Sequence, residues 1–375
     1  MKILIITPYA EPEKGACVVR VNAFREFFTA SGHEVCVLAP GRAGVMGDAN
    51  VERYGSIAAL MEKIAFGKFD AIIGTSPPIT HNFFALLAAK VAGSRFLLDA
   101  KDPFTGIMKK MDPEKEGTLK FRLFEIIESF THRNADRVMF LCAPYLESAR
   151  AKFGLPAGKV FLAPNGTDTE KIYYDPAQRK KIRKDLGLGA SLVIAYIGGI
   201  GDEDLLGFSE KSFPALAKRH GAKIIFIISY EPGQQALLDQ IKGNLERAGV
   251  LGSAAFLFSV PFEKLYKYLS AADIGLVPYP NFEMPVVVAK AYDCAAAGLP
   301  LACKSLPGNS ELEKFAEANR IGFVSQDWDE FNKKFAAMVG KMLPARGHVI
   351  GVAKKYSRKN GCRAALGEIE KLAGK

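Results

Sequence analysis

PYPNFEMPVVVAKAYDCAAAGLPLA, residues 278–302, combines a loop, a helix and a strand in one continuous stretch. We predict a helix that begins near Pro285, because proline favours the first helical position. It ends at Gly298, because glycine favours the position just past a helix. A strand, Pro300–Cys303, follows directly. Loop, helix and strand in this order are typical of an alternating α/β domain.

Two charged residues of this helix are candidates for binding a ligand. Lys290 and Asp293 lie three positions apart, so they are neighbours on one helical face. The start of a helix exposes unpaired N–H groups that favour a phosphate or another anion. A carboxylate further along can accept hydrogen bonds from sugar hydroxyls. From these residues alone two interpretations stay open: a ligand site, or a buried helix in which Lys290 and Asp293 pair.

The same alternation of strand and helix runs along the whole chain. At 375 residues the chain exceeds the roughly 250–300 residues of a single core, so two domains are expected. We predict two doubly wound domains, 1–170 and 191–358, joined by a polar linker, 171–190. The predicted strands are 2–7, 34–39, 71–74, 95–100, 137–142 and 160–163 in the first half, and 222–229, 254–258, 274–277, 300–303 and 322–324 in the second, after a strand that ends in Gly198.

The charge and the composition indicate which partners and which cellular location to expect. The formal net charge of +10 predicts attraction to anions such as nucleotide diphosphates or acidic lipids. No basic run is interleaved with aromatic residues, so we expect no nucleic-acid partner. No apolar run reaches the roughly 18 residues of a membrane span, and the chain begins with a strand rather than a signal peptide. The six cysteines show no metal spacing, and we expect reduced packing residues in a cytoplasmic protein.

The segment Lys290–Pro300, KAYDCAAAGLP, resembles the K-x-[FY]-E-Y-x-A-x-G-x-P signature of family 4 glycosyltransferases. The resemblance implies the GT-B fold, two Rossmann-like domains facing a central cleft, and a retaining reaction. It also implies that Asp293 holds the ribose of a nucleotide sugar and that the closing helix, 359–375, returns to the first domain. Pro285 stands where the family often has a glutamate that contacts the donor sugar.

Two further segments resemble the same family. Ser76-Pro77-Pro78 and the later Asp99–Phe104 are similar to S-P-P and D-x-R-D-P-W, with lysine and phenylalanine in place of arginine and tryptophan. Lysine lacks the flat two-pronged donor of arginine, so this exchange is not neutral. Pro164–Asp168, PNGTD, is similar to the P-N-G-x-D element at the junction of the family's domains.

Candidate site residues of the first domain follow the ends of predicted parallel strands, where open α/β sheets bind ligands. Lys101 is expected to face a phosphate or an acidic acceptor, Asp102 to accept from the acceptor hydroxyl, and His81 to bond sugar or phosphate. Asp102 and His81 could instead cap the structures that follow them. The first loop contains Gly15 but no G-x-G-x-x-G, which argues against a nicotinamide dehydrogenase. The resemblance places this loop under the donor phosphates.

In the second domain, Gly198 and Gly199 end a strand, where their backbone can approach a diphosphate closely. The resemblance makes the Val260 backbone a candidate base contact, against a plain strand-to-helix turn. Many family members add an arginine and a lysine that neutralise the phosphates, but this glycine loop has no such pair. It is followed by the acidic run 202–204, which we expect to cap a helix rather than bind a metal. No cofactor or metal is expected.

The segment 104–120 is predicted to be a mobile loop, followed by a helix over 119–133. Its basic positions predict either a solvated face or contact with a membrane surface. These positions are Lys109, Lys110, Lys115, Lys120 and Arg122.

The resemblance implies a retaining glycosyltransferase that moves a sugar from a nucleoside diphosphate sugar to an acceptor hydroxyl. By family habit the acceptor is a cell-surface polysaccharide or a lipid-linked glycan, reached from the cytoplasm at the inner membrane face. Two alternatives stay open: a degenerate GT-B subunit that binds without catalysing, and a GT-B sugar-nucleotide epimerase or hydrolase. The sugar, base, acceptor and linkage do not follow from the sequence.

Overall fold

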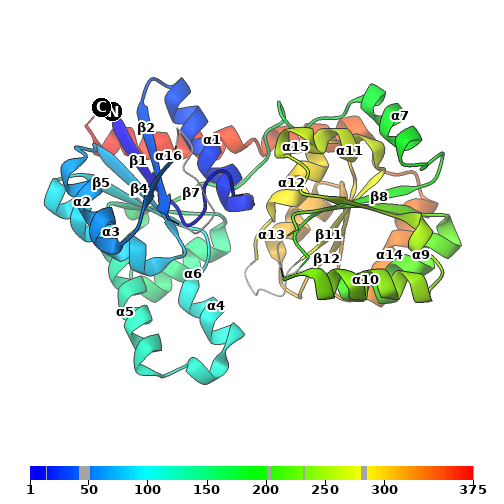
Figure 1. Cartoon of the computed structure of the whole chain (residues 1–375), viewed down its shortest axis with the longest axis horizontal. Coiled ribbons are helices and arrows are strands. Elements are labelled where there is room, and N and C mark those ends of the chain that lie inside the picture. The colour runs from blue at the N-terminus through cyan, green and yellow to red at the C-terminus, as the bar shows by residue number, and fades with distance from the viewer. Residues whose placement is uncertain (14, 42–50, 201–203, 231–232, 280–284, 375) are drawn as a thin grey trace. The chain divides into compact units, whose positions relative to one another are not determined.

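A computed structural model of the chain describes residues 1–13, 15–41, 51–200, 204–230, 233–279 and 285–374 (Figure 1). The chain divides into two compact units. Unit 1 comprises Met1–Asn165 and Arg358–Lys375, and unit 2 comprises Gly166–Ser357. The segment 171–190, expected to link two domains, lies within unit 2. There its helix, α7 (Pro176–Asp185), contributes the buried Ile182 to the core.

Unit 1 contains a sheet of seven parallel strands in the order β3-β2-β1-β4-β5-β6-β7. The strands are β1 Lys2–Ile6, β2 Glu34–Pro40, β3 Val51–Tyr54, β4 Ala71–Ser76, β5 Arg95–Ala100, β6 Arg137–Phe140 and β7 Val160–Leu162. The helices are α1 Ala16–Ala30, α2 Ile57–Phe66, α3 Ile79–Ala92, α4 Phe104–Met111, α5 Leu119–Asn134, α6 Ala143–Phe153 and α16 Arg358–Leu372, with short 3-10 helices η1 Pro113–Lys115 and η2 Ala157–Lys159.

Unit 2 repeats this order with six parallel strands, β10-β9-β8-β11-β12-β13. The strands are β8 Val193–Gly198, β9 Lys223–Ile228, β10 Ala254–Phe258, β11 Ile274–Pro278, β12 Leu301–Lys304 and β13 Gly322–Ser325. Beside α7, the α-helices are α8 Leu205–Gly207, α9 Phe213–His220, α10 Gln235–Arg247, α11 Leu265–Ala271, α12 Ala289–Ala296, α13 Ser310–Glu313, α14 Trp328–Gly340 and α15 Arg346–Lys355. The short 3-10 helices are η4 Leu251–Ser253 and η5 Phe262–Lys264, and the short π-helices are η3 Phe208–Ser212 and η6 Lys314–Ala318.

Both sheets are buried on two faces, as continuous apolar strands require. In unit 1, α1 and α16 cover one face: Phe24 and Phe28 pack with Leu366 and Ile369 over Ile3 and the other strand residues of that side. In unit 2, one face lies under α12 and α15, and the other under α9, α10 and α14. The strand order reverses between β1 and β4 and between β8 and β11, which is where such sheets bind ligands.

Three parts of unit 1 differ from the sequence prediction. Residues 104–115, expected to belong to a mobile loop, form α4 and η1, so that prediction is wrong. The edge strand β3 and the helix α2 were not predicted. The strand β3 is only four residues long, VERY, and carries two charges, so it lacks the apolar pattern that marks a buried strand.

In the part of the chain that the structure describes, no helix is both long and apolar enough to cross a membrane. All six cysteines are free, and four of them are buried.

Candidate functional site

The helix α12 begins at Ala289 rather than near Pro285, so the predicted start of this helix is wrong. Pro285 is followed by three valines, whose β-branched side chains disfavour helix, and Val288 has an extended backbone. This segment is held in place from the loop after β12: the Asn309 amide donates to the Val286 carbonyl at 3.3 Å and to Ser305 Oγ at 3.2 Å. The amino end of α12 therefore lies four residues later than expected.

Lys290, in the first turn of α12, reaches the end of β8. Its Nζ lies 4.8 Å from the centre of the Tyr196 ring and 3.4 Å from the Tyr196 hydroxyl. Gly198 ends β8 with a φ of +143°, and a Cβ there would lie 2.6 Å from Lys290 Nζ. Glycine is therefore needed for the ammonium to sit against the backbone at this strand end. The structure brings together two residues that the sequence marked separately.

Gly199 continues this strand end. The Tyr196 hydroxyl donates to its carbonyl oxygen, which orients the peptide beyond Gly198. A Cβ on Gly199 would meet nothing within 4 Å. The Gly198–Gly199 backbone therefore combines an open side with a cation close by, an arrangement that suits a diphosphate.

Asp293 lies one turn further along α12 and is only 5% exposed. Its Oδ1 accepts a hydrogen bond of 2.9 Å from the hydroxyl of Thr167, which is fully buried. The Thr167 N–H in turn donates to the carbonyl of Tyr356. Burial raises the pKa of the neighbouring Cys294 thiol to about 12, with Asp293 raising it further and Lys290 opposing. Asp293 and Lys290 thus act on the same buried position.

The acidic run after β8 lies partly outside the described residues, which include Asp204 but not 202 and 203. Asp204 caps α8 by accepting from the Gly207 N–H at 3.0 Å, as predicted. Its Oδ2 also accepts from Lys304 Nζ at 3.0 Å and from the Trp328 indole at 2.8 Å. The chain leaving the glycines is therefore tied to the ends of β12 and α14.

Val260 lies just past the end of β10, the edge strand two positions from β8. Its side chain packs half-buried against the core of unit 2. The preceding Ser259 has a φ of +52°, and its N–H donates to the Ile228 carbonyl. The role of the Val260 backbone in binding a base stays a prediction.

In unit 1, His81 lies in the first turn of α3 and pairs with Tyr54 at the end of β3. The Tyr54 hydroxyl is 2.6 Å from His81 Nδ1. Burial lowers the pKa of His81 and raises the pKa of Tyr54 to about 12, so both are neutral near neutral pH. The phenol can donate to an unprotonated Nδ1, which leaves a proton on Nε2 for donation to a sugar or phosphate oxygen.

Lys101 directly follows β5, and its side chain reaches the first turn of α1. Its Nζ donates to Cys17 Sγ at 3.1 Å, two residues after Gly15. Gly15 precedes α1 with a φ of +127°, and a Cβ there would meet nothing within 4 Å. The structure therefore brings Lys101 to the loop that follows β1. Burial raises the pKa of Asp102, against an opposing effect of Lys101, so this carboxylate is more basic than an exposed one.

A buried ion pair supports this edge of unit 1, and sequence reasoning missed it. Arg20 Nε and Nη2 each donate to a different oxygen of Asp99 at 2.9 Å. Arg20 is 5% exposed and Asp99 is fully buried. Arg20 Nη1 also reaches the Asn165 side chain at 3.4 Å. Arg20 on the apolar side of α1 and Asp99 among the apolar residues of β5 were the available signal, because buried charges are usually paired.

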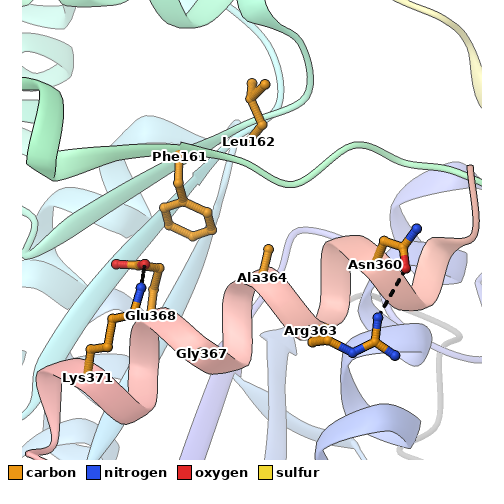
Figure 2. Close-up of a pocket in the computed structure, with 8 residues that line it drawn as sticks. All are labelled: Phe161, Leu162, Asn360, Arg363, Ala364, Gly367, Glu368 and Lys371. Carbon is orange, nitrogen blue, oxygen red and sulfur yellow. Dashed lines mark hydrogen bonds and ion pairs between the residues drawn. The ribbon is translucent and has the colours of Figure 1, made fainter.

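Within the described residues, no group of three or more His, Cys, Asp or Glu side chains could hold a metal ion. A pocket of about 450 Å³ lies between β7 and α16, and its lining residues are Phe161, Leu162, Asn360, Arg363, Ala364, Gly367, Glu368 and Lys371 (Figure 2). Its charged residues bond one another or their neighbours, as Glu368 does with Lys371 and Arg137. None of the predicted site residues lines it.

Residues 15–166 match the family model described as a glycosyl transferase 4-like domain. Unit 1 therefore carries a glycosyl transferase 4-like domain over these residues. The family that the sequence resembles, and with it a glycosyltransferase domain, is thus confirmed over residues 15–166. No curated protein sequence matches the chain.

Solved structures show the fold of the whole chain. HepE from Anabaena in complex with UDP-glucose has a TM-score of 0.76 at 14% identity, over 99% of this chain and 100% of that one. Sucrose-phosphate synthase from Thermosynechococcus elongatus has a TM-score of 0.74 at 15% identity, over 99% and 98%. MnaA from S. aureus with UDP has a TM-score of 0.61 at 11% identity, over 98% and 96%. The predicted GT-B fold is confirmed.

Proposed function

We propose that this glycosyltransferase moves a sugar from a nucleoside diphosphate sugar to an acceptor hydroxyl with retention of anomeric configuration. The observation that carries the proposal is the Lys290 ammonium, which occupies the place of a Cβ at Gly198, at the point where the strand order of unit 2 reverses. A cation beside two glycines at that point favours a diphosphate. The structures of HepE with UDP-glucose and with UDP support the same class of ligand.

In the proposed reaction, the bond between the anomeric carbon and the diphosphate oxygen breaks and a bond to the acceptor oxygen forms. Lys290 and the Gly198–Gly199 amides stabilise the negative charge on the departing diphosphate. Asp293 holds the ribose hydroxyls. We assign no metal or other cofactor, because Lys290 and the Gly198–Gly199 amides are proposed to stabilise the charge of the leaving group.

Residues of unit 1 are proposed to serve the acceptor. Asp102 accepts the proton of the acceptor hydroxyl, a role that suits its raised pKa. Lys101 faces an acidic acceptor or a phosphate, and neutral His81 donates to a sugar oxygen. The acceptor is proposed to be a cell-surface polysaccharide or a lipid-linked glycan, met in the cytoplasm at the inner membrane face. The formal charge of +10 favours such an anionic surface.

The donor is tested by thermal unfolding with UDP, GDP, ADP and TDP, since a ligand that binds only the folded state raises the melting temperature. The nucleotide that stabilises the protein most names the base. Lys290→Ala and Asp293→Ala are expected to weaken its binding about tenfold or more, because each removes a charged or hydrogen-bonded contact worth about 1.5–3 kcal/mol.

Lys341→Ala is the matched control, because Lys341 is exposed and lies outside the site. A variant at 290 or 293 that binds as tightly as the parent contradicts the role given to that residue. Nucleotide binding without sugar transfer to any acceptor would identify a binding subunit. The reason to test for one is Pro285, which stands where the family often has a glutamate. Release of diphosphate independent of acceptor would identify a hydrolase or epimerase. The anomeric configuration of the product, read by NMR, tests retention.

A further inference from the structure

A helical hairpin projects from unit 1. It consists of α4, η1 and α5, and Figure 1 shows it extending beyond the sheet. Three aliphatic side chains of α5 are exposed to solvent: Leu119 by 86%, Leu123 by 52% and Ile126 by 65%. They follow one another at intervals of four and three residues, so they lie on one face of the helix. We call these three residues the α5 stripe.

The stripe is not the face by which α5 packs. Phe121, Glu128 and Thr131 are buried and lie on the opposite side of the helix. On that side Glu128 accepts from the Thr105 hydroxyl at 2.5 Å and from Lys152 Nζ at 3.2 Å. The hairpin is therefore anchored by one face while the stripe stays in solvent. Adjacent exposed aliphatic residues on a fixed helix indicate an interaction surface.

The charges around the stripe favour an anionic partner. Residues 109–126, which include the whole stripe, contain five basic and four acidic side chains, a balance of +1. Two of the acids are already paired, Glu116 with Lys109 at 2.6 Å and Asp112 with Lys115. Lys120 and Arg122 lie exposed on the two sides of Leu119 and Leu123. Aliphatic residues with basic residues at both margins are the pattern of a helix that lies in a membrane interface.

We propose that the α5 stripe inserts into the interface of an anionic lipid bilayer, with Lys120 and Arg122 at the lipid headgroups. Leucine and isoleucine gain free energy on leaving water for the acyl boundary, and the basic side chains gain from the surface potential. The proposal deepens the membrane location given under the proposed function by naming the surface and the lipid chemistry. Its test uses no sugar donor, so its failure and the failure of the transfer reaction are separate results.

The experiment is flotation of the full chain with vesicles of phosphatidylglycerol and phosphatidylcholine, against vesicles of phosphatidylcholine alone. The parent is expected to float with the anionic vesicles, and less so at high salt. The variant L119S/L123S/I126S is expected to bind at least about tenfold more weakly. The matched control is F66S/V91S/M342S, which removes three apolar side chains that are 79%, 86% and 95% exposed elsewhere, and it should float like the parent.

A second variant, K110Q/K120Q/R122Q, tests the charge. It is expected to lose its preference for anionic over neutral vesicles while keeping its melting temperature, because all three side chains are exposed. The proposal is overturned if the parent does not float, or if the serine variant floats as well as the parent. It is also overturned if the serine variant instead converts a dimer into a monomer in light scattering, since the stripe would then be covered by a second copy.

Discussion

At the scale of single residues, the candidate donor site depends on a glycine that makes room for a lysine. Gly198 has a backbone conformation that other residues rarely adopt, and the space where its Cβ would lie is taken by Lys290 and Tyr196. Gly199, the next residue, has a negative φ and open space around it. Two adjacent glycines therefore serve different purposes, one in packing and one in ligand access.

Gly198→Ala is expected to lower the free energy of unfolding by about 1–3 kcal/mol, the cost of a strained backbone, and to displace Lys290. Gly199→Ala is expected to leave that free energy nearly unchanged but to weaken nucleotide binding, because the new methyl group blocks the approach of a diphosphate. Urea denaturation and nucleotide titration separate the two effects. Equal behaviour of the two variants in both measurements would contradict the difference drawn between these glycines.

At the scale of elements, α4 shows how a buried carboxylate can create a helix where the sequence suggests a loop. The segment FTGIMKKM contains glycine and adjacent lysines, and it was predicted to be mobile. Its first turn is held by Glu128 of α5, which accepts from both the N–H and the hydroxyl of Thr105. The signal for this helix lies 23 residues away in the chain, so local patterns do not show it.

Glu128→Gln is expected to destabilise the protein by about 1.5–3 kcal/mol, because it weakens hydrogen bonds to a charged group that is 1% exposed. The amides of α4 should exchange hydrogen faster than in the parent. Glu125→Gln, an exposed change on the same helix, is the control and should leave exchange in α4 unaltered. Unchanged exchange in Glu128→Gln would mean that other contacts hold α4.

The predictable elements share one property: their own residues form a continuous apolar run. Strands β1, β5 and β9 were predicted within one residue of their bounds for that reason. The start of α12 was misplaced because Pro285 satisfies a helix-start rule, while the three valines and Asn309 keep the segment irregular. In the site, Lys290 and Gly198 were marked by type and position. Their contact, and the Thr167 bond to Asp293, join residues about a hundred positions apart.

At the scale of the whole molecule, the chain completes unit 1 only with α16. Cys362, Ala365, Leu366 and Ile369 of this helix are buried in the core of unit 1. The chain leaves that unit at Asn165 and returns at Arg358, whose Nε donates to the Asn165 carbonyl at 3.2 Å. Unit 2 is thus a continuous segment inserted into a discontinuous first unit.

Ile369→Ala is expected to lower the free energy of unfolding of unit 1 by about 2–5 kcal/mol, the usual cost of a large-to-small change in a core. Unit 2 should keep its stability. The Ile369→Ala variant is therefore expected to bind nucleotide at Lys290 up to the same urea concentration as the parent. Ile126→Ala removes an exposed isoleucine of unit 1 and serves as control. Parallel loss of nucleotide binding and of unit 1 structure would show that the two units unfold together.

The late position of α16 also sets an order for folding during synthesis. On the ribosome, residues 1–165 emerge first, yet the part of their sheet that α16 covers stays exposed until residues 358–372 have been made. Residues 166–357 form a complete unit before that point. The nascent protein must therefore expose part of an apolar sheet while its second half is translated. We expect chaperones to bind α1 and the strands of unit 1 mainly during this period.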